Sequence, residues 1–205
     1  MRIVLASGSA RRPELLAALG LAFTVAPAGV DEAAFTGTPR KLALALAVAK
    51  ARAGAERAGP DAAVIGADTL VALGERVFGK PADAAEAIAT LTALRGRTHE
   101  VLTGVAVVAA GGEASALAVT RVTMREYTDA ELAAYVATGD PLDKSGAYAV
   151  QHPTFAPAAR VQGCRCSVIG LPLWTVRALL ASVAGIETDE PHFERCAACP
   201  ERPAP

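Results

Sequence analysis

One stretch near the N-terminus, Leu5-Ala-Ser-Gly-Ser-Ala-Arg-Arg-Pro-Glu-Leu-Leu16, joins a strand, a tight turn and a helix. The apolar residues of Arg2–Leu5 predict a short buried strand before the turn. The spacing of the leucines predicts a helix from Ala10 to Leu19, with Ser9 as its N-cap. Backbone N–H groups at a helix start have no partner within the helix, so the turn predicts a site for an anion.

Two arginines extend this prediction to phosphate groups. Arg11 and Arg12 place guanidinium groups in the first helical turn, where positive charge opposes the helix dipole. A bound anion offsets that repulsion, and the turn adds the hydroxyl groups of Ser7 and Ser9. We therefore predict that these four residues bind phosphate. The alternative is a solvated pair of arginines on a surface helix.

Length and composition favour a single domain. The chain has 205 residues, of which 52% are hydrophobic, and a net charge of -1. This content suffices for a packed core, and the balanced charge does not favour nucleic acid as a partner. We predict one domain over residues 1–185 and a polar tail over residues 186–205 that lies outside the fold. No apolar run reaches the roughly 18 residues of a membrane span and no signal peptide is recognisable, so we expect a cytoplasmic protein without a membrane partner.

The order of the remaining elements predicts an α/β fold with a mixed sheet. Strands are expected at 21–26, 62–73 with an interruption at 66–69, 77–78, 99–109, 114–127, 146–150 and 160–163. Helices are expected at 38–57, 82–94, 128–138 and 172–183. Gly111-Gly112 is typical of a hairpin turn, and Thr128 with Glu131 predicts a capping box.

Asp68 is the strongest candidate for a catalytic residue. It interrupts an apolar strand, and a buried carboxylate is costly unless it is paired or bound to a metal. Gly66 and Ala67 are small, so we expect room for a ligand beside it. Such an aspartate can bind a divalent cation or accept a proton from water; the alternative is a structural aspartate. Glu32 is a weaker candidate for a second metal ligand, with a solvated loop acid as the alternative.

Lysine is scarce, which draws attention to the positions that keep it. Of the 20 basic residues, only four are lysines: Lys41, Lys50, Lys80 and Lys144. The others are arginines, so the lysine positions are candidates for sites that need the compact charge of an ammonium group. Further along, small residues follow Asp143, and Gln151 carries both a donor and an acceptor. That combination suits contact with a nucleobase edge.

Together these motifs closely resemble the signature of the Maf family, in the family's order and over roughly residues 2–183. The motifs are the opening stretch 5–16, Gly66-Ala-Asp-Thr69, Gly79-Lys-Pro81, Leu94-Arg-Gly-Arg-Thr-His99, Thr103-Gly104, Leu142-Asp-Lys-Ser-Gly-Ala-Tyr148 with Gln151, and Gly170-Leu-Pro-Leu173. The resemblance implies a twisted mixed sheet with flanking helices and two lobes around a central cleft, akin to the inosine triphosphate pyrophosphatases. It also implies cleavage of a nucleoside triphosphate to the monophosphate and pyrophosphate, with Mg²⁺ or Mn²⁺ as cofactor.

The resemblance also assigns roles to individual residues. Asp68 matches the family's proton acceptor, and Glu32 matches an acid beside the site. The phosphate-binding residues would be Ser9, Arg11, Arg12, Lys50 and Lys80. Arg11, Thr69 and Gln151 match the positions that sort substrates, and this trio resembles the branch that prefers dTTP and UTP.

Other functions remain open at this point. One alternative is a pyrophosphatase for modified purine nucleotides such as 7-methyl-GTP. Another is a non-catalytic regulator of septum formation, and a homodimer is also possible for the family. Asp68 together with the lysines favours catalysis, because an interaction module would not need this set.

The four cysteines exceed the family pattern. Cys164 and Cys166 are expected on a strand with both thiols on one side, and Cys196 and Cys199 have the spacing of a metal knuckle. The two pairs could form a tetrahedral zinc site that holds the tail. Reduced, unrelated thiols and disulfides are the alternatives, and disulfides are disfavoured in a cytosolic chain.

Overall fold

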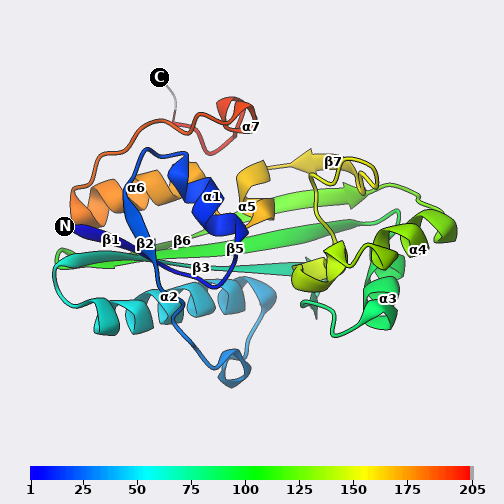
Figure 1. The fold of residues 1–205 in the computed structure, drawn as a ribbon, viewed down its shortest axis with the longest axis horizontal. Coiled ribbons are helices and arrows are strands. Elements are labelled where there is room, and N and C mark those ends of the chain that lie inside the picture. Colours follow the sequence, from blue (N-terminus) through cyan, green and yellow to red (C-terminus); the bar gives the residue numbers. More distant parts are fainter. Residues whose placement is uncertain (204–205) are drawn as a thin grey trace.

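The computed structural model describes residues 1–203 and contains a mixed sheet of seven strands (Figure 1). The strands follow the order β2-β1-β3-β5-β6-β7, and β4 pairs with β3 beside this path. β1 is parallel to β2 and β3, and the other pairings are antiparallel. The strands are β1 (Arg2–Ala6), β2 (Phe23–Val25), β3 (Ala62–Leu73), β4 (Arg76–Phe78), β5 (Thr98–Ala109), β6 (Gly112–Met124) and β7 (Ala158–Gln162).

Helices cover both faces of the sheet, as the α/β prediction requires (Figure 1). One face carries α2 (Pro39–Ala58), and the other carries α1 (Arg11–Ala17), α5 (Arg165–Ile169) and α6 (Leu173–Ala184) (Figure 1). α2 approaches the sheet very closely at Gly66, where a Cβ atom would collide with the backbone of Ala47 and Ala51. Small residues therefore fix the position of α2 on β3, and with it every side chain that α2 presents.

A second group of elements lies at the far end of the three long strands (Figure 1). It contains α3 (Ala84–Leu94), α4 (Asp129–Ala137) and the short 3-10 helices Asp140–Asp143 and Ser145–Ala147. Its own apolar core includes Leu91, Tyr127 and Phe155, separate from the core around α1 and α6. The predicted capping box is confirmed, because Thr128 and Glu131 exchange hydrogen bonds at the start of α4. Two lobes thus share one continuous sheet.

Three local predictions are wrong. β3 runs through 66–69 without interruption, because all four residues pair with β5 and Gly66 also pairs with β1. Residues 146–150 do not form a strand, since Gly146 has a φ of 75° and bonds the carbonyl of Gly79. Helix α1 has Ala10 as its N-cap, and Ser9 makes no capping bond.

The tail does not lie outside the fold. The short helix α7 (Glu194–Ala197) and the residues around it pack on α6, where the Trp174 indole donates to the carbonyl of Cys196 over 3.1 Å. Phe193 also packs against the core that surrounds α1 and α6. The tail was predicted to lie outside the fold because its composition is polar, but a few apolar side chains such as Phe193 are enough to hold it against the core. Within residues 1–203, no helix combines the length and hydropathy needed to cross a membrane.

Candidate active site

The predicted site residues come together in one cleft of about 650 Å³. The cleft lies where the turn after β1, the middle of β3 and the 3-10 segment of the far lobe approach one another. Its lining includes every residue proposed from the sequence for phosphate, the base and the divalent cation of the reaction: Ser7, Ser9, Arg11, Arg12, Glu32, Lys50, Asp68, Thr69, Lys80 and Gln151. The structure therefore brings these residues together, and it adds contacts among them that the sequence did not show.

Asp68 lies at the floor of the cleft and is paired with Lys50. Its Oδ1 atom is 2.5 Å from the Lys50 ammonium group, which also contacts Glu32 Oε1 at 2.6 Å. The Asp68 side chain is only 8% exposed, whereas that of Glu32 is 58% exposed. Within the described residues, Asp68 Oδ2 is buried without a hydrogen-bond partner. A buried carboxylate oxygen without a partner is costly, so this atom is available to accept a proton or to bind a cation.

The position of Asp68 against Lys50 follows from the packing of α2 on β3. The space beside Gly66 was predicted for a ligand, but the backbone of α2 fills it. Glycine is required there because any side chain would push the helix away from the strand. The close approach is what brings Lys50 of α2 within reach of Asp68.

Asp68 and Glu32 are the carboxylates that could hold a divalent cation. Hard cations such as Mg²⁺ bind carboxylate oxygens and commonly share oxygen atoms of substrate phosphates. The unpartnered Oδ2 of Asp68 and the exposed Glu32 supply such donors, and both acids already converge on one positive charge at Lys50. These residues therefore fit the cation that the family resemblance implies.

Arg12 is a buried organising residue. Its Nε donates to the carbonyl of Gly170 over 2.8 Å, and its two terminal nitrogens contact Ser7 Oγ at 3.0 Å and Thr69 Oγ1 at 3.3 Å. The pKa of Arg12 is lowered by burial, and the nearby Asp68 carboxylate offsets only part of that shift. Arg12 thus joins the turn after β1, the strand β3 and the segment after α5 by charge-assisted hydrogen bonds.

Arg11 spans the cleft and contacts the far lobe. Its Nη1 lies 2.7 Å from Asp143 Oδ2, and Lys144 lies 2.6 Å from the other oxygen of that carboxylate. Burial would raise the pKa of Asp143, but hydrogen bonds from Lys144 and Arg11 lower it below its usual value. Sequence reasoning missed Asp143 as a partner, because nothing in the local pattern links residues so far apart in the chain.

The remaining cleft residues differ in how firmly they are held. Thr69 Oγ1 bonds Thr103 Oγ1 at 3.0 Å, and Thr103 in turn donates to the carbonyl of Ser167, so the Thr69 hydroxyl is fixed. Lys80 and Gln151 are exposed, and within the described residues their side chains make no hydrogen bond or ion pair. They are free to contact a ligand.

A buried histidine supports the cleft from behind. His99 Nε2 lies 2.8 Å from the hydroxyl of Tyr148, and Tyr148 lines the cleft. Burial lowers the pKa of His99 to about 4, so its ring is neutral at pH 7. The sequence did contain a signal for this residue, since a histidine within an apolar strand needs a partner.

The four cysteines lie outside the cleft, where the start of α5 meets the tail. Cys164 and Cys166 stand at the beginning of that helix and not on a strand as predicted. All four are free and buried. They belong to a separate part of the molecule.

Comparisons with known proteins identify the family of this chain. Residues 2–183 match the family described as Maf-like protein. A dTTP/UTP pyrophosphatase of Moorella thermoacetica is 51% identical over 88% of this chain and 94% of that relative. Relatives with the same name from Deinococcus radiodurans and Thermomicrobium roseum are 46% and 42% identical, over 87% and 100% of this chain and 91% and 95% of their own lengths.

Among solved structures, a nucleoside-triphosphatase / dITP/XTP pyrophosphatase from Mycobacterium abscessus aligns with a TM-score of 0.38 and 20% identity. It covers 60% of this chain and 74% of its own, a match too distant to inform fold or function. The family match and the relatives are decisive without it. This chain belongs to the Maf-like protein family.

Proposed function

We propose that this protein is a nucleoside triphosphate pyrophosphatase that cleaves dTTP and UTP to the nucleoside monophosphate and pyrophosphate. The observation that carries the proposal is the unpartnered, buried Oδ2 of Asp68 beside the Lys50 ammonium group. The names of the relatives in three organisms point to the same activity and the same two substrates.

In this mechanism Asp68 acts as the general base. A water molecule between Oδ2 and the substrate loses its proton to Asp68 as its oxygen bonds the α-phosphorus. The bond between that phosphorus and the bridging oxygen breaks, and the electron pair leaves with pyrophosphate. Lys50 holds Oδ1 of Asp68 and fixes the direction of its carboxylate, so Oδ2 is left for the attacking water.

The other charged residues bind the triphosphate. Arg11 and Lys80 reach the cleft from opposite lobes, so they can hold the phosphates in line with the attacking water. Arg12 holds the turn in place and supplies a fixed positive charge. A divalent cation bound by Asp68 and Glu32 would supply further charge neutralisation on the phosphate oxygens.

Base selection is assigned to residues on the far side of the cleft. Gln151 has a free amide that can donate and accept, which matches the alternating groups on the edge of a pyrimidine. Tyr148, fixed by His99, forms part of the surface beside it. A site that hydrogen-bonds one base rejects another strongly, because the wrong base leaves buried polar groups unpaired.

The test is a screen of dTTP, UTP, CTP, GTP, ATP and 7-methyl-GTP in the presence of Mg²⁺ or Mn²⁺. Pyrophosphate release and chromatography of the nucleotide product are measured together, which distinguishes pyrophosphatase from phosphatase activity. We expect the monophosphate as product and the highest kcat/KM for dTTP and UTP. Release of inorganic phosphate, or a purine nucleotide as best substrate, would contradict the proposal.

A further inference from the structure

A cluster of four cysteines lies outside the active site and has no part in the proposed reaction. Cys164 caps α5 and Cys166 lies in its first turn, while Cys196 lies in α7 and Cys199 follows it. Their exposed fractions are 2%, 1%, 1% and 7%. The chain therefore buries all its thiols in one place, where two distant segments meet.

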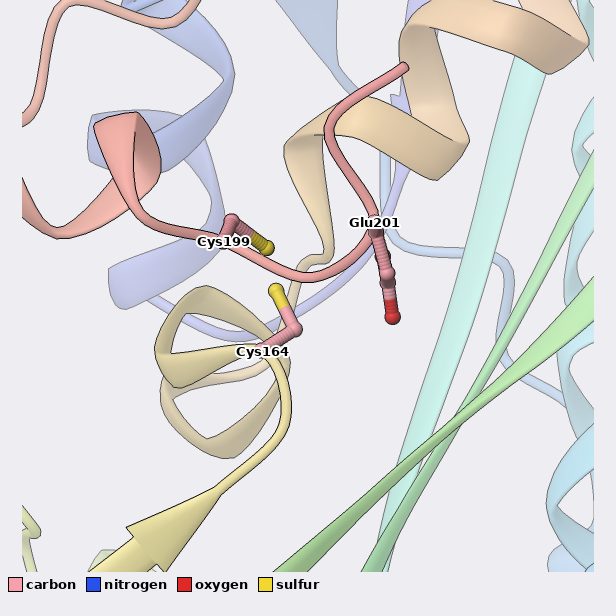
Figure 2. A group of neighbouring side chains, drawn as sticks. All are labelled: Cys164, Cys199 and Glu201. Atoms are coloured by element: carbon pink, nitrogen blue, oxygen red, sulfur yellow. The ribbon is translucent and has the colours of Figure 1, made fainter. Parts of the chain in front are cut away.

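The thiols face one another in crossed pairs. Cys166 Sγ lies 3.2 Å from Cys196 Sγ. The ligand atoms of Cys164, Cys199 and Glu201 all lie within 4.8 Å of one another, and the thiols of Cys164 and Cys199 point toward each other (Figure 2). Each pair joins one cysteine of α5 to one cysteine of the tail.

The thiols lie within the apolar core that surrounds α1 and α6. A coordinated thiol is deprotonated outright, so a metal site here also needs groups that stabilise negative charge on sulfur.

A backbone donor is already directed at one of the sulfurs. The Ser167 N–H group points at Cys164 Sγ, with a distance of 3.4 Å between nitrogen and sulfur. Hydrogen bonds of this kind are stronger when the acceptor is charged, so they would stabilise thiolates more than thiols.

We propose that Cys164, Cys166, Cys196 and Cys199 bind one Zn²⁺ ion as a structural site that fastens the tail to α5. Four sulfur ligands select zinc or iron, and zinc favours a closed tetrahedral site. Zinc–sulfur bonds of about 2.3 Å place the sulfurs about 3.8 Å apart. Among the described residues, only Cys164, Cys199 and Glu201 have ligand atoms that all lie within 4.8 Å of one another, so the second pair, Cys166 and Cys196, has to close around the ion when it binds.

Glu201 is the competing ligand, and the structure gives it another partner. Its Oε2 accepts a hydrogen bond from Thr175 Oγ1 over 2.7 Å. This contact holds the carboxylate against α6. Four protein ligands also leave no open position for a reacting water, so the site has a structural role.

We expect the ion to hold α5 and the Gly170 segment that follows it in place beside the active site. α5 is followed by Gly170, whose carbonyl accepts the hydrogen bond from Arg12. The tail has its own contacts with α6, through Trp174 and Thr175. Zinc would tie these two regions together at α5.

The deciding experiment is elemental analysis of the full chain purified without chelators. We expect about one zinc per chain, and a loss of zinc in both Cys166→Ser and Cys196→Ser. Glu201→Gln is the matched control and keeps the ion. Zinc retained by Cys166→Ser but lost by Glu201→Gln would overturn the four-thiolate set.

A second measurement on the unmodified protein does not depend on how the variants fold. Thiols are titrated under denaturing conditions with and without a strong chelator, alongside the Tm of the native protein. We expect four thiols, and a Tm that the chelator lowers by at least about 5 °C. Four thiols without any zinc would overturn the proposal, and so would fewer thiols, which would indicate a disulfide.

Discussion

The active-site cleft and the cysteine cluster differ in whether their polar groups are left without partners or are buried against one another. In the cleft, Asp68 keeps one carboxylate oxygen without a partner, and exposed residues such as Gln151 stand ready beside it. In the cluster, every thiol is buried and faces another sulfur or a carboxylate. The cleft therefore leaves polar groups available to a ligand, whereas the cluster keeps its sulfur atoms away from solvent.

The two regions also differ in how the family match covers them. The match spans residues 2–183, which includes the whole cleft but only one half of the cysteine cluster. The other half lies in the tail that packs on α6. We infer that the cleft carries the activity of the family and that the cluster is an addition that stabilises this chain.

The largest expected effect is a loss of catalytic rate, without a loss of stability, when Asp68 is replaced. Asp68→Asn removes the general base, and we expect kcat to fall by roughly 10²–10⁴-fold. The fold should persist, because an amide of the same shape can still accept a hydrogen bond from Lys50. Steady-state pyrophosphate release and the Tm are measured on the same preparation.

The control for that variant is Asp61→Asn. Asp61 is an exposed acid directly before β3, so its substitution removes the same charge beside that strand without touching the cleft. It should retain the activity of the unmodified protein. Comparable losses in both variants would remove Asp68 from its proposed role.

The cysteine cluster should show the reverse behaviour. Cys199→Ser removes a proposed zinc ligand and should lower the Tm by about 5 °C or more, since loss of a metal belongs to the strongly destabilising changes. Measured at 25 °C on folded protein, kcat should stay within about twofold of the original, because the cluster contributes no group to the cleft. A loss of activity as large as that of Asp68→Asn would erase the distinction between the two regions.

Parts of this comparison could be read from the sequence. Asp68 was recognisable because a charged residue inside an apolar strand is expensive, and the tract Ser7–Arg12 was recognisable from its turn residues. The motif order placed the other cleft residues. These signals are local, or depend on a resemblance that spans the chain.

The rest depends on contacts between distant segments. The role of Gly66 was misjudged, because the sequence does not show that α2 packs on it. The tail appeared polar, yet Phe193 and two cysteines anchor it to the core. Asp143 gave no signal of its pairing with Arg11, since that contact crosses the cleft.

The support behind the cleft can be tested through pH. The pKa of His99 is about 4, below its ordinary value near 6.5, because burial disfavours the charged ring. The unfolded chain therefore binds more protons between these values, and the stability that His99 contributes is lost as the pH falls from about 6.5 to 4. The expected loss is about 3 kcal/mol.

The measurement compares the free energy of unfolding of the unmodified protein and His99→Gln from pH 7 to pH 4. The difference between the two curves should shrink or reverse toward low pH, because glutamine does not titrate. His192→Gln, which changes an exposed histidine of the tail, serves as the control and should follow the original curve. Parallel curves for the His99 variant would show that its burial does not control stability in acid.

The smallest expected effect concerns the contact that crosses the cleft. Arg11→Ala should raise the KM for dTTP by roughly 10- to 150-fold, since one charged hydrogen bond to phosphate contributes about 1.5–3 kcal/mol. Arg52→Ala is the control, because Arg52 pairs with Glu113 on the outside of the sheet.

Asp143→Asn then decides what the Arg11–Asp143 contact does. If Asp143 only holds Arg11 until the substrate arrives, the asparagine variant keeps or lowers the KM, because the phosphate no longer competes with a carboxylate. A KM raised as far as in Arg11→Ala would instead mean that the ion pair itself shapes the cleft. In that case the cleft, like the cysteine cluster, would depend on contacts between distant segments, and not only on groups left free for a ligand.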